Sequence, residues 1–135
     1  MKKIIIFTDG ASRGNPGPSA IGAVLRDEQN KPVARISQCI GIATNNQAEY
    51  RAIIAALEEA LKLGATYAEL NSDSELAVRQ INGRYRVKNA ALKPLHQRVK
   101  QLSSRLEGFT VNYVPRRRNT AADKLTNMAL DRAVD

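Results

Sequence analysis

The first apolar run of the chain, with the loop behind it, constrains the fold more than any other stretch. Residues 4–7 read Ile-Ile-Ile-Phe, and such a run of β-branched and aromatic residues is typical of a strand buried on both faces. We expect this strand over residues 3–9, ending at Asp9, before a glycine- and proline-rich loop over residues 10–18. A buried central strand that ends on a carboxylate is where an open α/β sheet places its chemistry. An Asp-Gly pair after a strand is also an ordinary turn, so Asp9 alone leaves both interpretations open.

The rest of the chain predicts a mixed α/β sheet with helices on its faces. Short polar turns separate the first three expected strands, which favours an antiparallel meander, and the later strands alternate with helices. The length of 135 residues suits one hydrophobic core, and no linker or repeat is visible, so we expect a single domain over residues 1–135. The expected strands cover residues 3–9, 20–27, 33–42, 67–72 and 109–114, and the expected helices cover residues 44–63, 74–81, 92–106 and 120–133.

Composition favours a soluble globular protein over a membrane protein or a disulfide-bonded one. Hydrophobic residues make up 43% of the chain and charged residues 25%, which is ordinary for a globular domain. No apolar run approaches the roughly 18 residues of a membrane span, and the start of the chain lacks a secretory signal pattern, so a cytoplasmic location is expected. The single cysteine, Cys39, cannot form an internal disulfide and is predicted to be a small buried hydrophobic residue.

Positive charge is concentrated in one segment of the chain. Residues 79–118 contain eleven Lys or Arg residues and one acid, whereas the other 95 residues contain ten basic and twelve acidic side chains. The net charge of the whole chain is +8. This asymmetry indicates a polyanionic partner, with nucleic acid as the first candidate, and a merely solvated basic face is the alternative.

Three further acids stand at junctions between elements, as Asp9 does. Glu49 lies in the first turn of the first expected helix, in line with apolar residues four, seven and eleven positions later, so it should face the sheet. Asp73 follows the fourth expected strand, whose parallel neighbour would be the first strand, and this places it beside Asp9. Asp123 lies in the first turn of the last expected helix.

Each of these three acids also has a purely structural interpretation. Asn46-x-x-Glu49 and Thr120-x-x-Asp123 resemble capping boxes, and Asp73 is placed to cap the helix that follows it. Capping, however, does not require acids from four elements to converge at one end of a sheet. Clustered carboxylates repel one another and persist where hard cations neutralise them. Oxygen ligands without cysteine or histidine indicate Mg²⁺ or Mn²⁺ rather than zinc, and two such ions roughly 3.5 to 4 Å apart would promote phosphodiester hydrolysis.

Four stretches of the sequence, in the same order and spacing, together resemble type 1 ribonuclease H. The resemblance covers nearly the whole chain. It implies a ribonuclease H-like fold, with a five-stranded mixed sheet in the order 3-2-1-4-5, strand 2 antiparallel, flanked by helices. It also implies endonucleolytic hydrolysis of the RNA strand of RNA/DNA hybrids, leaving 3′-hydroxyl and 5′-phosphate ends. The four stretches are Phe7-Thr8-Asp9-Gly10-Ala11 with Gly14-Asn15-Pro16-Gly17, Thr44-Asn45-Asn46-Gln47-Ala48-Glu49, Ser72-Asp73-Ser74, and Asn119-Thr120-Ala121-Ala122-Asp123-Lys124-Leu125.

The resemblance assigns roles to individual residues. It implies that Asp9, Glu49, Asp73 and Asp123 hold two Mg²⁺ ions, or Mn²⁺ in their place, with Asp9 bridging both. It further implies that Glu49 accepts a hydrogen bond from an RNA 2′-hydroxyl, the group that distinguishes RNA from DNA. Some of the residues expected to contact nucleic acid also have structural interpretations, since Asn15 suits a turn and Asn45 and Asn46 suit helix caps. The residues expected to contact nucleic acid are Gly10, Asn15, Asn45, Asn46, Arg84, Lys88, Asn89, Arg116 and Arg118.

The sequence departs from the family in two regions that bind substrate or assist catalysis. Many relatives carry a histidine in the loop before the last helix, where this chain has three consecutive arginines and its only histidine, His96, lies elsewhere. We hypothesise that Arg116 or Arg118 contacts phosphate in its place, with plain electrostatic attraction as the alternative. Many relatives also carry a basic, tryptophan-bearing protrusion, whereas only residues 83–91 span that gap here and the chain has no Trp. Binding should therefore be weaker and more sensitive to salt.

Two other functions compete with the ribonuclease H interpretation. A non-cleaving nucleic-acid-binding module of the same fold is one, but a binder gains nothing from a carboxylate cluster that repels phosphate. An integrase- or resolvase-like nuclease is the other, but such proteins usually carry extra domains. The expected partner is thus an RNA/DNA hybrid, with double-stranded RNA as a further candidate, no membrane, and a monomeric protein.

Overall fold

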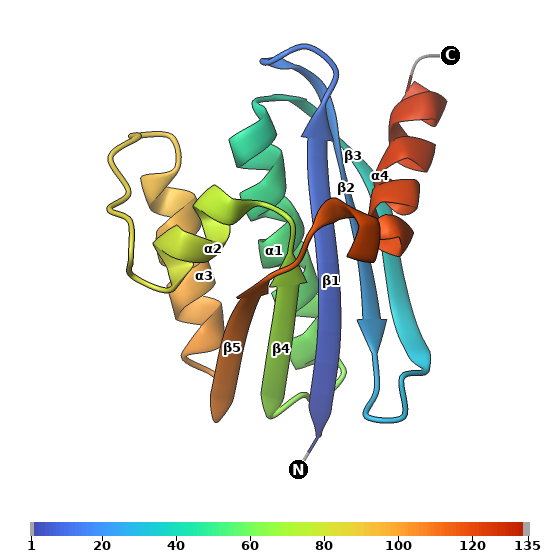
Figure 1. Cartoon of the computed structure of the whole chain (residues 1–135), viewed down its shortest axis with the longest axis vertical. Helices are drawn as coiled ribbons and strands as arrows, with labels where there is room; N and C mark the ends of the chain where they lie inside the picture. Colours follow the sequence, from blue (N-terminus) through green and yellow to red (C-terminus); the bar gives the residue numbers. More distant parts are fainter. Residues whose placement is uncertain (1, 134–135) are drawn as a thin grey trace.

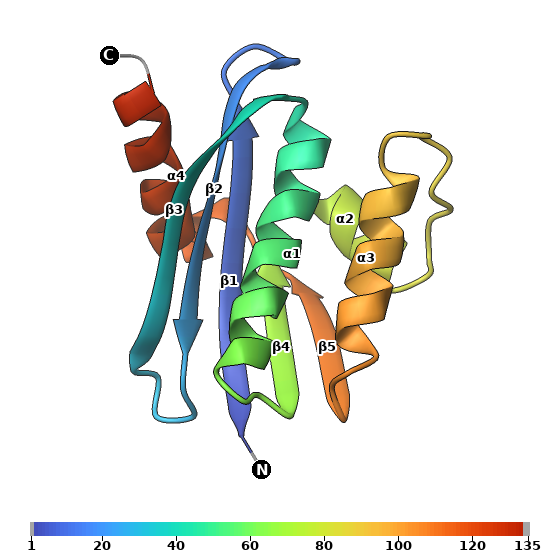
Figure 2. The same ribbon diagram turned by 180° about the vertical axis from the view of Figure 1, so that it is seen from behind.

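Three antiparallel strands begin the sheet and two parallel strands complete it. The computed structural model describes residues 2–133, and it places α1 and α3 on one face of the sheet and α4 on the other (Figures 1 and 2). In chain order the elements are β1 (Lys3–Ser12), β2 (Gly17–Arg26), β3 (Pro32–Ala43), α1 (Asn45–Lys62), β4 (Tyr67–Ser72), α2 (Glu75–Ile81), α3 (Lys93–Ser103), β5 (Gly108–Tyr113), the 3₁₀ helix η1 (Arg116–Arg118) and α4 (Thr120–Ala133).

The strand order β3-β2-β1-β4-β5 confirms the predicted topology. β1 lies at the centre, antiparallel to β2 and parallel to β4, while β2 and β3 pair antiparallel and β4 and β5 pair parallel. The parallel pairing of β1 with β4 ends at Thr8 opposite Ser72. Asp9 follows Thr8 in β1, and Asp73 directly follows the end of β4. The sheet itself therefore brings the two carboxylates together, as predicted.

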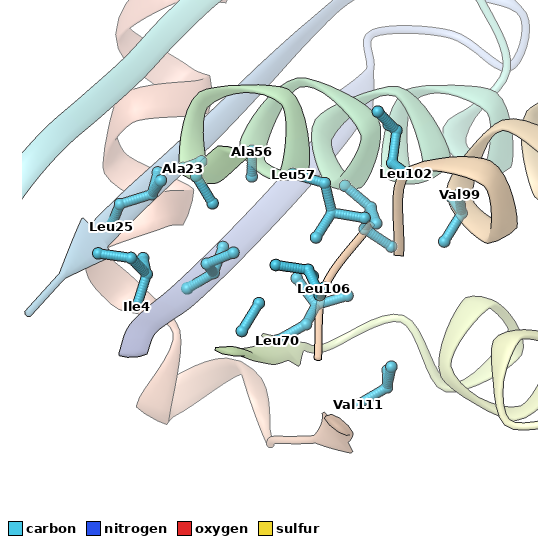
Figure 3. Packing of buried hydrophobic residues seen from close by; sticks show 14 of the residues in the cluster. Ile4, Ala23, Leu25, Ala56, Leu57, Leu70, Val99, Leu102, Leu106 and Val111 are labelled. Atoms are coloured by element: carbon cyan, nitrogen blue, oxygen red, sulfur yellow. The ribbon is translucent and has the colours of Figure 1, made fainter. Parts of the chain in front are cut away.

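The main core lies between the sheet and the helices α1 and α3. Ile4 and Ile6 of β1 are fully buried there, because alternate residues of a strand face the same side. Leu57 of α1 and Leu102 of α3 pack against the same cluster, and Figure 3 shows these side chains meeting over the sheet. Burying leucine and isoleucine side chains stabilises the fold by about 1.5 to 3 kcal/mol each, so this cluster holds β1, which carries Asp9, firmly in place.

The opposite face has a smaller core that docks α4. Ala20 of β2 packs there with Ala129 and Leu130 of α4. Gly22 permits the close approach, because a Cβ at this position would lie 2.4 Å from the backbone oxygen of Ala122. The backbone of β2 and the first turns of α4 are therefore in direct contact, and this contact fixes the place of Asp123.

Some sequence expectations about local structure are wrong. β1 does not end at Asp9 but continues to Ser12, because its antiparallel partner β2 extends the pairing to Ser12 opposite Ser19. The expected helix over residues 92–106 ends at Ser103, where the chain turns to begin β5. Cys39 is exposed rather than buried, because β3 is an edge strand.

Within residues 2–133, no helix combines the length and the apolar character that crossing a membrane requires.

Replacing Gly22 by alanine should weaken the docking of α4. The added methyl group would clash with the Ala122 carbonyl and with Thr126, so we expect a loss of about 1 to 3 kcal/mol in the free energy of unfolding. Urea denaturation of Gly22→Ala beside the wild type measures this loss. An unchanged midpoint and slope would show that α4 does not need the close approach.

Candidate active site

Three carboxylates from three different elements converge at the C-terminal ends of β1 and β4. One oxygen each from Asp9, Glu49 and Asp73 lies within 4.8 Å of the other two. Asp9 comes from the central strand, Asp73 directly follows β4, and Glu49 lies in the first turns of α1, whose N-terminal end lies at this end of the sheet (Figure 1). The structure thus brings together three of the four predicted acids.

Glu49 is held against β1 by a close backbone contact. A Cβ on Gly10 would lie 2.3 Å from the Ala48 carbonyl carbon and 2.5 Å from the Glu49 nitrogen, so only glycine permits this approach. The Gly10 N–H donates a short hydrogen bond to Glu49 Oε1. Gly10 is itself buried, and its observed role is to place α1 and its glutamate beside Asp9.

Neighbouring residues, and not the acids, supply the caps of α1 and α2. Thr44 caps α1 and forms a capping box with Gln47, so Asn46 and Glu49 do not make the box that their spacing suggested. Ser74 caps α2 through a hydrogen bond from the Ala77 N–H, which frees the Asp73 carboxylate. The structural interpretations of Glu49 and Asp73 are therefore wrong.

Asp123 flanks the cluster rather than joining the closest group. It is half-buried in the first turn of α4, and its charge raises the pKa of Asp9, so the two carboxylates are near neighbours. Among the described residues, its carboxylate accepts no hydrogen bond from Thr120, and the predicted capping box of α4 does not form. Asp123 thus remains free to act with the other three acids.

Burial makes the charged form of Asp9 costly. Desolvation first, and then the negative charges of Asp73 and Asp123, raise the pKa of Asp9 to about 6. The nearby Thr126 hydroxyl and the positive charge of Arg116 act in the opposite direction. Asp9 is 2% exposed, so little water screens these interactions.

The same physical causes act on Glu49. Burial, followed by the charges of Asp9 and Asp73, raises the pKa of Glu49 well above its usual value, while the Gly10 N–H lowers it. Asp9 and Glu49 therefore lie close to other carboxylates although the neighbouring negative charges disfavour the ionisation of both. Such an arrangement is typical of a functional site.

The cluster fits a hard divalent cation. Asp9 Oδ2 and Asp73 Oδ2 are both buried and have no hydrogen-bond partner among residues 2–133, which is costly unless something positive meets them. The donor set consists only of carboxylate oxygens, which suit Mg²⁺ or Mn²⁺ rather than a softer metal. The residues present are thus suited to hold a metal ion.

Two arginines of the segment before α4 lie in different environments. Arg116 Nε lies 3.8 Å from Asp73 Oδ2, with the arginine largely exposed and the aspartate buried. Arg118 instead lines a cavity with Phe7, Val24 and Arg26. Of the two arginines that the sequence proposed as phosphate contacts, only Arg116 is shown beside the acids.

Three predicted asparagines lie exposed beside the start of α1. The Asn45 N–H donates to Asn15 Oδ1 at 3.0 Å, and the Ser12 N–H donates to Asn45 Oδ1 at 2.8 Å. These bonds use the two side-chain oxygens and leave both amide NH₂ groups without an acceptor among the described residues. Asn46 also has no side-chain partner there, so all three present free donors, and Thr44 rather than Asn45 or Asn46 caps the helix.

The loop between α2 and α3 carries the other predicted contacts. Arg84 and Lys88 are exposed there, and the loop lies at the same end of the molecule as the N-terminal end of α1 (Figures 1 and 2). Asn89 has a structural role, since its Oδ1 accepts the Ala91 N–H at 2.8 Å. Tyr85 packs under the Arg79 guanidinium, 5.3 Å from the ring centroid.

Sequence reasoning assigned no role to two residues that hold the site together. Asn119 Nδ2 donates to the Thr8 carbonyl at 2.8 Å, and Thr126 Oγ1 lies 3.3 Å from the Asp9 carbonyl. Both are buried polar residues on α4 or directly before it. Their spacing could have indicated this role. Asn119 lies four residues before Asp123 and Thr126 lies three residues after it, which places all three on one helix face.

The sheet order and the acid cluster define a ribonuclease H-like protein. A family model described as reverse transcriptase-like matches residues 7–129. The chain is 48% identical over 132 residues to the bifunctional protein Rv2228c of Mycobacterium tuberculosis, which covers 97% of this chain but 36% of that protein. It is 43% identical over 131 residues to ribonuclease HI of Halobacterium salinarum, covering 97% of this chain and 66% of that protein.

Solved structures of similar proteins also superpose closely on this chain. The N-terminal RNase H domain of Rv2228c superposes with a TM-score of 0.96 at 46% identity, covering 99% of this chain and 97% of that chain. LC11-RNase H1, isolated from compost by a metagenomic approach, has a TM-score of 0.93 at 41% identity in its complex with an RNA/DNA hybrid, covering 98% and 99% of the two chains. The chain belongs to the ribonuclease H family. It spans only about a third of the length of the mycobacterial relative.

The raised pKa values predict how the metal-free protein responds to pH. An acid whose pKa folding raises adds nothing below its unfolded-state pKa of about 3.9. It destabilises the fold increasingly as the pH rises from there to its folded-state pKa, and by a constant amount above it. For Asp9 that value is about 6. Asp9→Asn should therefore match the wild type below pH 4 and exceed its free energy of unfolding at pH 8, by up to about 3 kcal/mol.

Urea denaturation in EDTA at the two pH values measures this difference. Glu107→Gln, which neutralises an exposed acid, serves as the control and should change stability little at either pH. An Asp9→Asn protein no more stable than the wild type at pH 8 would contradict the repulsion described above.

Proposed function

We propose that this chain is an endoribonuclease that hydrolyses the RNA strand of RNA/DNA hybrids, leaving 3′-hydroxyl and 5′-phosphate ends. One observation carries the proposal: three acids from separate elements lie within 4.8 Å of one another, and two of them, Asp9 and Asp73, have a buried oxygen without a hydrogen-bond partner among residues 2–133. Membership of the ribonuclease H family supports it, as does the relative LC11-RNase H1, whose structure is a complex with an RNA/DNA hybrid.

We infer that Asp9, Glu49, Asp73 and Asp123 hold two divalent ions, Mg²⁺ first and Mn²⁺ as the alternative. Bound ions would supply an activated water and charge stabilisation at the leaving oxygen. The chain contributes four negative charges in fixed positions, two of them on carboxylates whose ionisation is costly until a cation arrives. Cation binding should therefore release protons and strengthen with rising pH.

Glu49 is the residue suited to detect ribose. Its Oε1 accepts the Gly10 N–H, and its Oε2 has no hydrogen-bond donor among residues 2–133. We propose that Oε2 accepts a hydrogen bond from an RNA 2′-hydroxyl, a group that DNA lacks. Gly10 would then contact the nucleic acid as well, because it lies beside this glutamate.

Two surfaces at the same end of the molecule are proposed to bind the hybrid. The free amide groups of Asn15, Asn45 and Asn46 suit the minor groove, where both A·T and G·C pairs present acceptor atoms. Arg84 and Lys88 would bind the phosphate backbone, with Asn89 shaping their loop. Because several of these contacts are electrostatic, affinity should fall steeply with salt. Double-stranded RNA as a second substrate, a monomeric state and a cytoplasmic location stay predictions of the sequence.

A cleavage assay tests the proposed function directly. With Mg²⁺, a labelled RNA/DNA hybrid should be cut in its RNA strand, and matched double-stranded DNA should remain intact. Asp73→Asn should reduce turnover by about 10³-fold or more, because it removes a proposed metal ligand without changing shape. A double-stranded RNA lane reports the range of substrates. Hybrid binding without cleavage in either Mg²⁺ or Mn²⁺ would favour a non-cleaving nucleic-acid-binding module instead.

The two arginines should differ in their effect on turnover. Arg116 lies beside Asp73 and is placed to contact a phosphate at the acids, whereas Arg118 lies in a different cavity. Arg116→Ala should therefore lower kcat about tenfold or more, and Arg118→Ala should mainly raise KM, more at low salt than at high salt because salt screens the attraction that is lost. Equal turnover in the two variants and the wild type would leave only electrostatic attraction as the function of this segment.

A further inference from the structure

We propose that Asn119 and Thr126 are positioning residues that set the separation of Asp9 and Asp123, and thereby the affinity of the acid cluster for divalent cations. The inference rests on the proposed function, because it concerns the acids that hold the metal there. It assigns to each of the two side chains a role that packing alone does not require.

Asn119 fastens the start of α4 to the central strand. Its side chain is 1% exposed, and its Nδ2 donates to the Thr8 carbonyl at 2.8 Å. Thr8 is the last β1 residue paired with β4, and Asp9 follows it directly. The hydrogen bond therefore joins the residue that precedes α4 to the residue that precedes the central acid of the cluster.

Thr126 makes a second attachment one peptide further along β1. Its hydroxyl is fully buried, 3.3 Å from the Asp9 carbonyl and 3.0 Å from the carbonyl of Ala122. A hydroxyl has one proton to donate, so it is shared between the strand and the helix. Gly22 makes room for this hydroxyl, since a Cβ there would lie 2.5 Å from Thr126 Oγ1.

The two attachments lie on either side of Asp123. Residues 119, 123 and 126 follow the i, i+4, i+7 spacing that lines one face of a helix. Two consecutive carbonyls of β1, those of Thr8 and Asp9, are thus tied to α4 above and below the fourth acid. The distance from Asp123 to Asp9 is consequently set by these two bonds, together with the close approach of β2 and α4 at Gly22, and not by the carboxylates, which repel each other.

Asn119 bonds to Thr8 instead of capping α4. It directly precedes α4, and asparagine at that position normally accepts a hydrogen bond from the first helical turn, which contributes about 1 kcal/mol. Asn119 Oδ1 instead has no partner, and its Nδ2 is directed to Thr8. Helix stability alone would favour the capping arrangement, so the observed orientation serves the connection to β1.

Residues that orient metal ligands without touching the metal commonly change metal affinity by 10- to 100-fold. We therefore expect Asn119→Ala and Thr126→Val to bind Mg²⁺ at least tenfold more weakly than the wild type, as measured by calorimetric titration without nucleic acid. In hybrid cleavage, the Mg²⁺ concentration for half-maximal activity should rise by a similar factor, while KM for the hybrid stays unchanged. Thr126→Ser, which keeps the hydroxyl, should restore wild-type affinity.

Two control variants separate positioning from stability. Val99→Ala creates a cavity at a fully buried position of α3, on the other face of the sheet, and should lower the melting temperature without altering Mg²⁺ affinity. Asn127→Ala removes an exposed asparagine from α4 and should change neither quantity. If Asn119→Ala does not fold, the pair Thr126→Val and Thr126→Ser decides the question by itself.

Wild-type Mg²⁺ affinity in Asn119→Ala and Thr126→Val, or an equal loss in Val99→Ala, would overturn the inference. This failure is distinct from a failure of the proposed function. A wild-type protein that binds Mg²⁺ but cuts no hybrid overturns the proposed function, while the calorimetric comparison of variants still decides the positioning role. A wild-type protein that binds neither Mg²⁺ nor Mn²⁺ overturns both.

Discussion

Repulsion among buried carboxylates is the constraint on which the rest of this structure depends. Asp9, Glu49 and Asp73 would separate if their elements were free to move, because like charges repel and the neighbouring carboxylates raise the pKa of Asp9 and of Glu49. Three kinds of interaction prevent this separation. Parallel pairing fixes Asp73 beside Asp9, the bare backbone of Gly10 admits α1, and the Leu- and Ile-rich core holds the sheet against that helix.

Other residues cap the helices, and this keeps the acids available to bind a cation. Thr44 and Ser74 satisfy the free N–H groups at the starts of α1 and α2, so neither Glu49 nor Asp73 is committed to a helix. Uncharged residues cap these helices at little cost, whereas carboxylates supply the negative charge that a hard cation needs. Ser74 directly follows Asp73, and Thr44 lies five residues before Glu49, so each cap is close in sequence to the acid that it leaves available.

Much of this arrangement was predictable from the sequence. The antiparallel meander and the mixed sheet with helices followed from short turns and apolar runs, and the strand order followed from the resemblance to type 1 ribonuclease H. The meeting of Asp9 with Asp73 followed from the neighbouring parallel strands. The choice of caps was not predictable, because Thr44 and Asn46 are both good candidates two residues apart and tertiary contacts decide between them. The exposure of Cys39 and the division between Arg116 and Arg118 likewise depend on which edge or loop each residue reaches in three dimensions.

The small alanine-rich contact beneath α4 has a consequence for how the molecule loses its function. α4 packs through a small apolar cluster, Ala20, Ala129 and Leu130, and through hydrogen bonds to β1 and to Ser37 of β3, so less apolar surface opposes its detachment than opposes that of α1. The helix is therefore the unit that should open first under thermal fluctuation, ahead of the sheet and α1. Such opening would move Asp123 away from the cluster while leaving the other three acids in place. The site would therefore lose its fourth carboxylate well below the temperature at which the core melts.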